Sequence, residues 1–86
     1  MNIFEFARIF QGKSVALNIL EYLVNNNGEY NGSYRELSEI VKGKGDTASE
    51  VRNNVMWLVD KGFIYAESQK NRSTYICVDE NWMNKI

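Results

Sequence analysis

The chain contains no histidine and a single cysteine, Cys77. Without an imidazole, no side chain has an ordinary pKa suited to proton transfer near neutral pH. Zinc sites and Ser-His-Asp triads also lack their usual ligands and bases. Carboxylate pairs such as Glu36 and Glu39 fall where solvated faces are expected, which is a poor setting for acid–base chemistry. We therefore expect a protein that is not an enzyme and that holds no metal or cofactor.

Long apolar runs are also missing. Charged side chains interrupt the N-terminal third at Glu5, Arg8, Lys13 and Glu21, so no stretch approaches the roughly 20 apolar residues that cross a bilayer. A lone cysteine cannot form an intrachain disulfide, and no signal-peptide pattern is present, which together indicate a reducing compartment. We expect a cytoplasmic protein with no membrane partner.

Length and composition indicate one small domain over residues 1–86, because 44% hydrophobic and 24% charged residues are ordinary for a folded chain. The net charge of −1 argues against a protein that coats nucleic acid through bulk electrostatics. Charge is unevenly spread, however, since residues 42–72 carry six basic and four acidic side chains. That excess is a weak signal because solvated surfaces often carry a similar imbalance.

Two helices are predicted before residue 28. Apolar residues at three- and four-residue spacing predict a helix at about 2–11, ended by Gly12: Ile3, Phe6, Ala7 and Phe10. The pattern resumes after Ser14 with Ala16, Ile19, Leu20, Leu23 and Val24 on one face. Asn25 to Gly28 should end this second helix in a glycine turn.

A helix-turn-helix is predicted at about 33–61. Ser33 and Glu36 have the spacing of a capping box, and so do Thr47 and Glu50, with Asp46 as a competing cap for the second helix. Inward-facing residues are expected at Leu37, Ile40 and Val41 in the first helix, and at Ala48, Val51, Val55, Leu58 and Val59 in the second. Glycines 43 and 45 separate the two helices, and Gly62 ends the second.

A two-stranded hairpin is predicted at about 63–78. Residues 63–67 and 74–78 are rich in β-branched and aromatic side chains and flank a polar tip that holds Lys70 and Arg72. Asp79 is expected to cap a last short helix. The predicted fold class is therefore α+β and mostly helical: a three-helix core, a two-stranded β wing, and short N-terminal and C-terminal helices.

This order of elements matches a winged helix-turn-helix, and two segments add to the match. Residues 58–64 resemble the end of the recognition helix in winged-helix repressors of the MarR and ArsR kind, and residues 72–76 resemble their returning wing strand. The resemblance runs from Ser14 to Val78 and implies a site-specific, double-stranded DNA-binding protein, most simply a transcriptional repressor.

A narrower resemblance is to the TubR family of centromere-binding adaptors in plasmid and phage partition. Residues 7–9 and 27–29 and the small size are similar. This resemblance implies dimers that bind repeated DNA sites and recruit a filament-forming GTPase.

The expected DNA contacts follow from placing helix 47–61 in a major groove and the 68–73 tip on backbone or minor groove. Arg52 could bond guanine and Asn53 adenine through two hydrogen bonds each. Thr47 and Ser49 suit phosphates at a helix N-terminus. Basic residues of the turn and the tip would neutralise backbone charge: Lys42, Lys44, Lys70 and Arg72.

A homodimer is expected, with its two reading helices about 34 Å apart or a multiple of that distance. The candidate dimer surface is apolar and comprises Ile3, Phe4, Phe6, Phe10, Trp82 and Met83.

Alternatives stay open at several of these positions. Exposed Arg and Asn side chains are ordinarily only solvated, and Glu50 suits a helix cap better than a base contact. Trp57, Tyr65 and Tyr75 are expected in the core or at an interface. The pI of 5.4 keeps a different class open, a winged-helix adaptor that binds a protein partner and never touches DNA.

Overall fold

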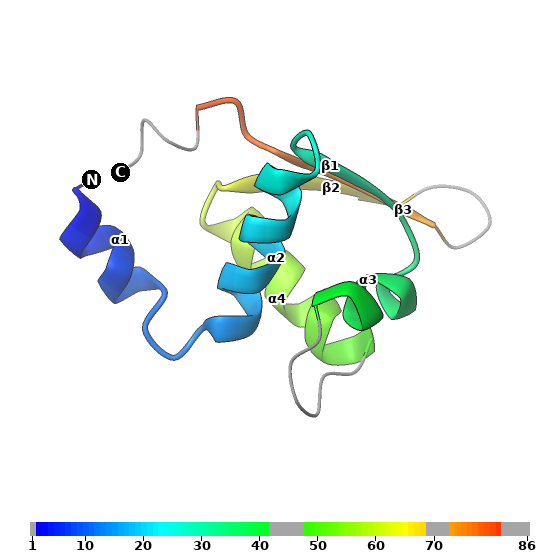
Figure 1. Cartoon of the computed structure of the whole chain (residues 1–86), viewed down its shortest axis with the longest axis horizontal. Coiled ribbons are helices and arrows are strands. Elements are labelled where there is room, and N and C mark those ends of the chain that lie inside the picture. The colour runs from blue at the N-terminus through cyan, green and yellow to red at the C-terminus, as the bar shows by residue number, and fades with distance from the viewer. Residues whose placement is uncertain (1, 42–47, 69–72, 82–86) are drawn as a thin grey trace.

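The computed structural model describes residues 2–41, 48–68 and 73–81. Within these ranges it has four helices and a three-stranded antiparallel sheet, so the chain is an α+β protein (Figure 1). The elements are α1 (Ile3–Ile9), α2 (Ser14–Asn25), β1 (Glu29–Gly32), α3 (Tyr34–Val41), α4 (Ala48–Asp60), β2 (Ile64–Ser68) and β3 (Thr74–Val78). None of these helices is long and apolar enough to cross a membrane.

The sheet has the order β1-β3-β2, with the last strand in the middle. Cys77 of β3 faces Glu29 of β1 on one side and Tyr65 of β2 on the other. The prediction of two strands was therefore incomplete. The sequence EYNG of β1 offers a single apolar side chain, Tyr30, and pairing with β3 rather than local propensity makes it a strand.

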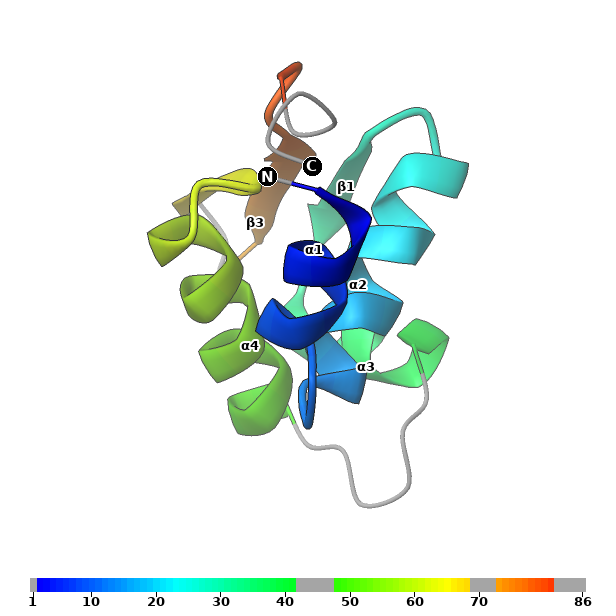
Figure 2. The same ribbon diagram turned by 90° about the vertical axis from the view of Figure 1, so that its left-hand side faces the viewer.

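The core lies between the helices and one face of the sheet, and it confirms the predicted periodicity of the main helices. Figure 2 shows α1 in front of the gap between α2 and α4, with the strands behind. Fully buried residues come from every layer, including Ile19, Leu37, Val55, Phe63 and Ile76.

Two residues predicted to face inward are exposed. Val24 lies on the edge of the α2 stripe near the helix end, and Ile40 is 47% exposed on α3. In the eight-residue α3, Leu37 is completely buried and Val41 half-buried, so the buried stripe is too narrow to include Ile40.

The first capping box is confirmed in part. The Glu36 amide donates to Ser33 Oγ at 3.1 Å, as predicted, but the Glu36 carboxylate accepts a bond from the Ser33 hydroxyl at 3.1 Å instead of from the Ser33 backbone amide. Thr47 of the second box lies outside the described residues. The last predicted helix, from Asp79, is not seen over residues 79–81, where the Asn81 amide donates to the Asp79 carboxylate at 2.8 Å; its remainder lies outside the described residues.

Left-handed glycines end α2 and α4 as predicted. Gly62 has φ 82°, its amide donates to the Val59 carbonyl, and the Phe63 amide donates to the Leu58 carbonyl. This pair of bonds is a Schellman motif, which leads the chain from α4 directly into β2. Gly28 has φ 81° and its amide donates to the Leu23 carbonyl at 2.7 Å, so α2 turns sharply into β1.

Candidate nucleic-acid interface

Helix α4 has one fully buried face and one exposed face. Val51, Val55 and Leu58 have no exposed surface and fix the rotation of the helix against the core. The opposite side carries Ser49, Arg52, Asn53 and Met56, all exposed and spaced at i, i+3, i+4 and i+7. We call these four residues the α4 outward face. It contains three of the residues predicted to contact DNA: Ser49, Arg52 and Asn53.

A groove of about 200 Å³ joins the α4 outward face to the β2–β3 hairpin. Arg52 and Met56 form its helical wall, and the opposite wall comes from the paired ends of β2 and β3, Ser68 and Thr74, with Ala66 and Glu67. Tyr34, at the start of α3, completes the lining. We call this the hairpin groove. A ligand that contacts Arg52 can therefore reach the hairpin as well.

The other predicted DNA contacts lie outside the described residues. These are Lys42, Lys44 and Thr47, in the segment that leads into α4, and Lys70 and Arg72, in the segment that joins β2 to β3. Both segments attach to elements that line the hairpin groove, since one precedes α4 and the other follows Ser68.

The sequence reasoning missed Met56 and Tyr34. Met56 is 51% exposed, which is unusual for a large apolar side chain in the middle of a helix. Its position four residues after Arg52 was a usable signal, because residues four apart share a helix face. Tyr34 carried no such signal, since it reaches the groove only through the packing of α3 against α4.

A hydrogen bond from β1 fixes the start of α3. The buried Tyr30 hydroxyl donates to the Ser33 carbonyl at 2.7 Å, at the residue that caps α3. Burial, with the Glu36 carboxylate and Tyr22 nearby, raises the pKa of Tyr30 from 10.0 to about 12. The phenol therefore stays protonated and keeps donating across the physiological pH range. This bond connects β1 to the start of α3, the helix that packs against α4.

The residues predicted for a dimer surface fall into two groups. Ile3 is 59% exposed and Phe4 is 70% exposed, so both are available to a partner. Phe10 is only 6% exposed, and its ring lies 5.4 Å from those of Phe63 and Trp57. Its assignment to an interface was wrong, because it is needed to dock α1 onto the core.

Phe6 is half-buried and belongs mostly to the same aromatic cluster. Its ring centroid lies 4.7 Å from that of Phe10 and 5.9 Å from that of Phe63, the latter edge-on. Trp82 and Met83 lie outside the described residues.

The outer face of the sheet carries tyrosines and carboxylates. Tyr75 donates to Glu29 Oε2 at 2.8 Å, and this hydrogen bond raises the pKa of Tyr75 to about 12. Tyr65 donates to Asp79 Oδ2 at 3.2 Å, and the charge of that carboxylate raises the pKa of Tyr65. Tyr65 is exposed rather than in the core, because it alternates with the buried Ile64 on its strand. No residue of β1, β2 or β3 is basic, so this face is acidic.

Trp57 and Cys77 are both half-buried. Trp57 packs on the core and has Lys13 Nζ 5.0 Å and Lys61 Nζ 5.9 Å from its ring centroid, both cation–π arrangements.

Among the described residues, no three His, Cys, Asp or Glu side chains gather in a way that would hold a metal ion. No family model, curated protein or solved structure matches this chain.

Proposed function

We propose that this protein is a winged-helix, site-specific binder of double-stranded DNA and acts as a transcriptional regulator. One observation carries the proposal: Arg52 and Met56 of the α4 outward face line the same groove as a β hairpin, and Asn53 is exposed next to Arg52 in the sequence. A helix and a neighbouring hairpin exposed on one side of a domain suit simultaneous contact with a major groove and the adjacent backbone.

Each residue of the α4 outward face has a distinct role in this proposal. Arg52 donates two hydrogen bonds to guanine, and Asn53 pairs with adenine in the same way, each contributing about 1–3 kcal/mol of discrimination. Ser49, in the first turn of α4, binds a phosphate with help from the N-terminal helix dipole. Met56 offers an apolar contact for a thymine methyl group on the same face.

The charge of one region of the chain supports the proposal. Residues 42–72, which include α4 and β2, carry six basic and four acidic side chains in a chain of net charge −1. Affinity should therefore depend on a few local phosphate contacts, so the salt dependence should be moderate. A protein that coated DNA non-specifically would need a larger positive field.

The test is selection of bound sequences from a random double-stranded DNA pool, followed by salt titration on the enriched site. Enrichment of one motif, with affinity that falls linearly with salt concentration on logarithmic axes, is the expected result. Arg52→Ala should weaken binding to that motif about 5- to 150-fold and relax the preference at one base pair. Asn53→Ala should relax a different position.

One control variant matches the change at Asn53. Asn18→Ala removes an exposed amide from α2. It should leave motif affinity within about twofold, as surface changes away from a contact ordinarily do. Absence of any enriched motif at low salt would overturn the proposal.

The selected DNA also separates two roles for the same binding activity. A single inverted repeat in a promoter fits a regulator. Several closely spaced repeats fit a partition adaptor that recruits a filament-forming GTPase, and cosedimentation of filaments with the DNA complex would then be expected.

A second candidate function is an adaptor that binds a protein partner. The observation that favours it is the acidic outer sheet face with Tyr65 and Tyr75, which suits a basic protein segment and repels DNA. For this function, Tyr65→Ala should abolish activity while Arg52→Ala has no effect. The DNA-binding proposal expects the reverse.

A further inference from the structure

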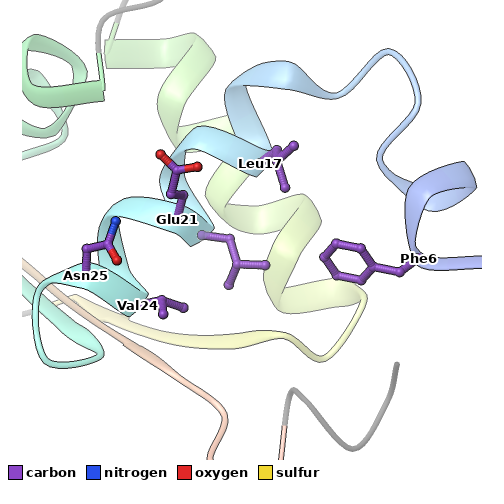
Figure 3. A pocket seen from close by; sticks show the side chains of 6 residues that line it. Phe6, Leu17, Glu21, Val24 and Asn25 are labelled. Atoms are coloured by element: carbon purple, nitrogen blue, oxygen red, sulfur yellow. The ribbon is translucent and has the colours of Figure 1, made fainter. Parts of the chain in front are cut away.

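An open apolar groove of about 230 Å³ lies between α1 and α2, away from the hairpin groove. Figure 3 shows Phe6 of α1 on one side, facing the exposed side of α2, where Leu17 and Val24 lie with Glu21 and Asn25. Leu20 supplies the remaining lining. The lining is almost entirely apolar, and Glu21 and Asn25 are its polar residues. We call this the α1–α2 groove.

The outward side of α1 protrudes, whereas the side facing α2 forms one wall of the groove. Phe4 projects from the helix with 70% of its side chain exposed, and Ile3 beside it is 59% exposed. Both differ from Phe6 and Phe10, which hold α1 against the core through the aromatic cluster with Phe63. The same small helix thus presents a protruding phenylalanine and one wall of an open apolar groove.

Charges at this site are also self-complementary. Arg8 lies one turn after Phe4 on the exposed side of α1, and Glu21 lies on the rim of the groove. If Phe4 of one copy enters the groove of another, Arg8 travels with it toward a carboxylate. A two-fold axis would make each contact twice, because an isologous interface uses the same patch on both copies.

We propose that the occupant of the α1–α2 groove is a second copy of this chain. Phe4 of each protomer inserts between Phe6 and Leu17 of its partner, and Arg8 pairs with Glu21 across the interface. This assignment does not depend on DNA binding.

The area that a stable interface buries indicates that both α1 and α2 take part in the contact. A typical specific contact buries about 800 Å² on each partner, which is roughly one seventh of the 5864 Å² surface of this chain. The seven residues of α1 are too few to supply this area, because about 20–30 residues a side are typical. The exposed side of α2 adds apolar surface to the contact, with Leu17 39% exposed and Val24 42% exposed.

The position of the groove leaves the proposed DNA-binding surface accessible. Figure 1 shows α1 at one end of the long axis, and the ends of β2 and β3 that connect to each other at the opposite end. A copy bound at α1 and α2 would therefore not cover the hairpin groove.

Sedimentation equilibrium of the full chain over a range of concentrations tests the proposal. The expected result is a reversible dimer. Phe4→Ser and Leu17→Ser should each raise the dimer dissociation constant about 30-fold or more, as truncation of a central apolar contact does. Ile40→Ser is the matched control, because Ile40 is an exposed large aliphatic residue on α3 and outside the groove. It should leave the constant unchanged.

A charge exchange identifies the partner as a second copy. Arg8→Glu and Glu21→Arg should each weaken the dimer about tenfold, since each replaces two attractions with two repulsions. The double variant should return to within about threefold of the original constant. A structural role for either residue would not produce that rescue.

Three results would overturn the proposal. One is a monomer at high micromolar concentration. Another is a dimer that Phe4→Ser and the charge reversals do not weaken. The third is a monomer that becomes a dimer only in Trp82→Ser, because then the groove is occupied by the C-terminal segment of its own chain. Loss of DNA binding in any of these variants neither supports nor contradicts the dimer proposal.

Discussion

A methyl group at Gly32 provides a direct test of how β1 holds the start of α3. A Cβ at this position would lie 2.6 Å from the Tyr30 hydroxyl oxygen and 2.9 Å from Cζ of the same ring. Both distances are well inside van der Waals contact, so the ring must move. Tyr30 is buried and its hydroxyl donates to the Ser33 carbonyl at 2.7 Å, so movement breaks that bond.

The cost of Gly32→Ala can be worked from these contacts. Overpacking a buried ring costs about 1–3 kcal/mol, and loss of one hydrogen bond costs about 0.5–1.5 kcal/mol. Alanine lowers the entropy of the unfolded chain, which offsets about 0.4–1 kcal/mol. We expect the free energy of unfolding to fall by about 2–3 kcal/mol, a large share of the stability of a small domain.

Urea denaturation of four proteins isolates the contact: the original chain, Gly32→Ala, Tyr30→Phe and the double variant. Tyr30→Phe alone should cost about 1 kcal/mol, because the Ser33 carbonyl keeps its bond from the Leu37 amide at 3.0 Å. With the hydroxyl gone, Gly32→Ala should cost at least about 1 kcal/mol less than it does in the original chain. Equal costs of Gly32→Ala in both backgrounds would refute the reasoning, and so would a Gly32→Ala protein as stable as the original.

Three further predictions concern the same scaffold. Gly62→Ala should lower the free energy of unfolding by about 1 kcal/mol, because φ of 82° is strained for a residue with a Cβ; an unchanged urea midpoint would contradict this. Ser33→Ala should also cost about 1 kcal/mol, since the Glu36 amide loses its cap; circular dichroism during thermal unfolding would report it, and an unshifted transition would count against the cap. The pKa of Tyr30 and that of Tyr75 are both raised to about 12, so each phenol stabilises the folded state while it is protonated. Their stability is complete below pH 10 and is lost as pH rises through about 12, so Tyr30→Phe with Tyr75→Phe should flatten the alkaline decline in urea titrations, and an undiminished decline would exclude these groups as its cause.

The helices could be predicted from the sequence because their signals are local. Spacing of apolar residues placed α2 and α4 within about two residues of their observed bounds. Ser33 with Glu36 identified the start of α3, and Gly62 the end of α4. Each signal depends only on residues within one or two helical turns, so it can be recognised from the sequence alone.

Strand β1 could not be predicted in the same way. Its residues include Asn31 and Gly32, which ordinarily favour turns, and it becomes a strand only because β3 supplies hydrogen bonds from far along the chain. The hairpin groove has the same origin, because Tyr34, Arg52 and Thr74 meet there only through packing. The burial of Phe10 likewise reflects Phe63 and Trp57, which are distant in sequence.

The central position of β3 has a consequence for the order of folding during synthesis. Glu29 leaves the ribosome long before Cys77, its partner across the sheet. The three-helix core can begin to pack once α4 is complete, but β1 and β2 keep open hydrogen-bonding edges until β3 enters between them. A ribosome that stalls before Thr74 would thus hold a helical intermediate with two exposed strand edges, and this stage should be the one most prone to aggregation and proteolysis.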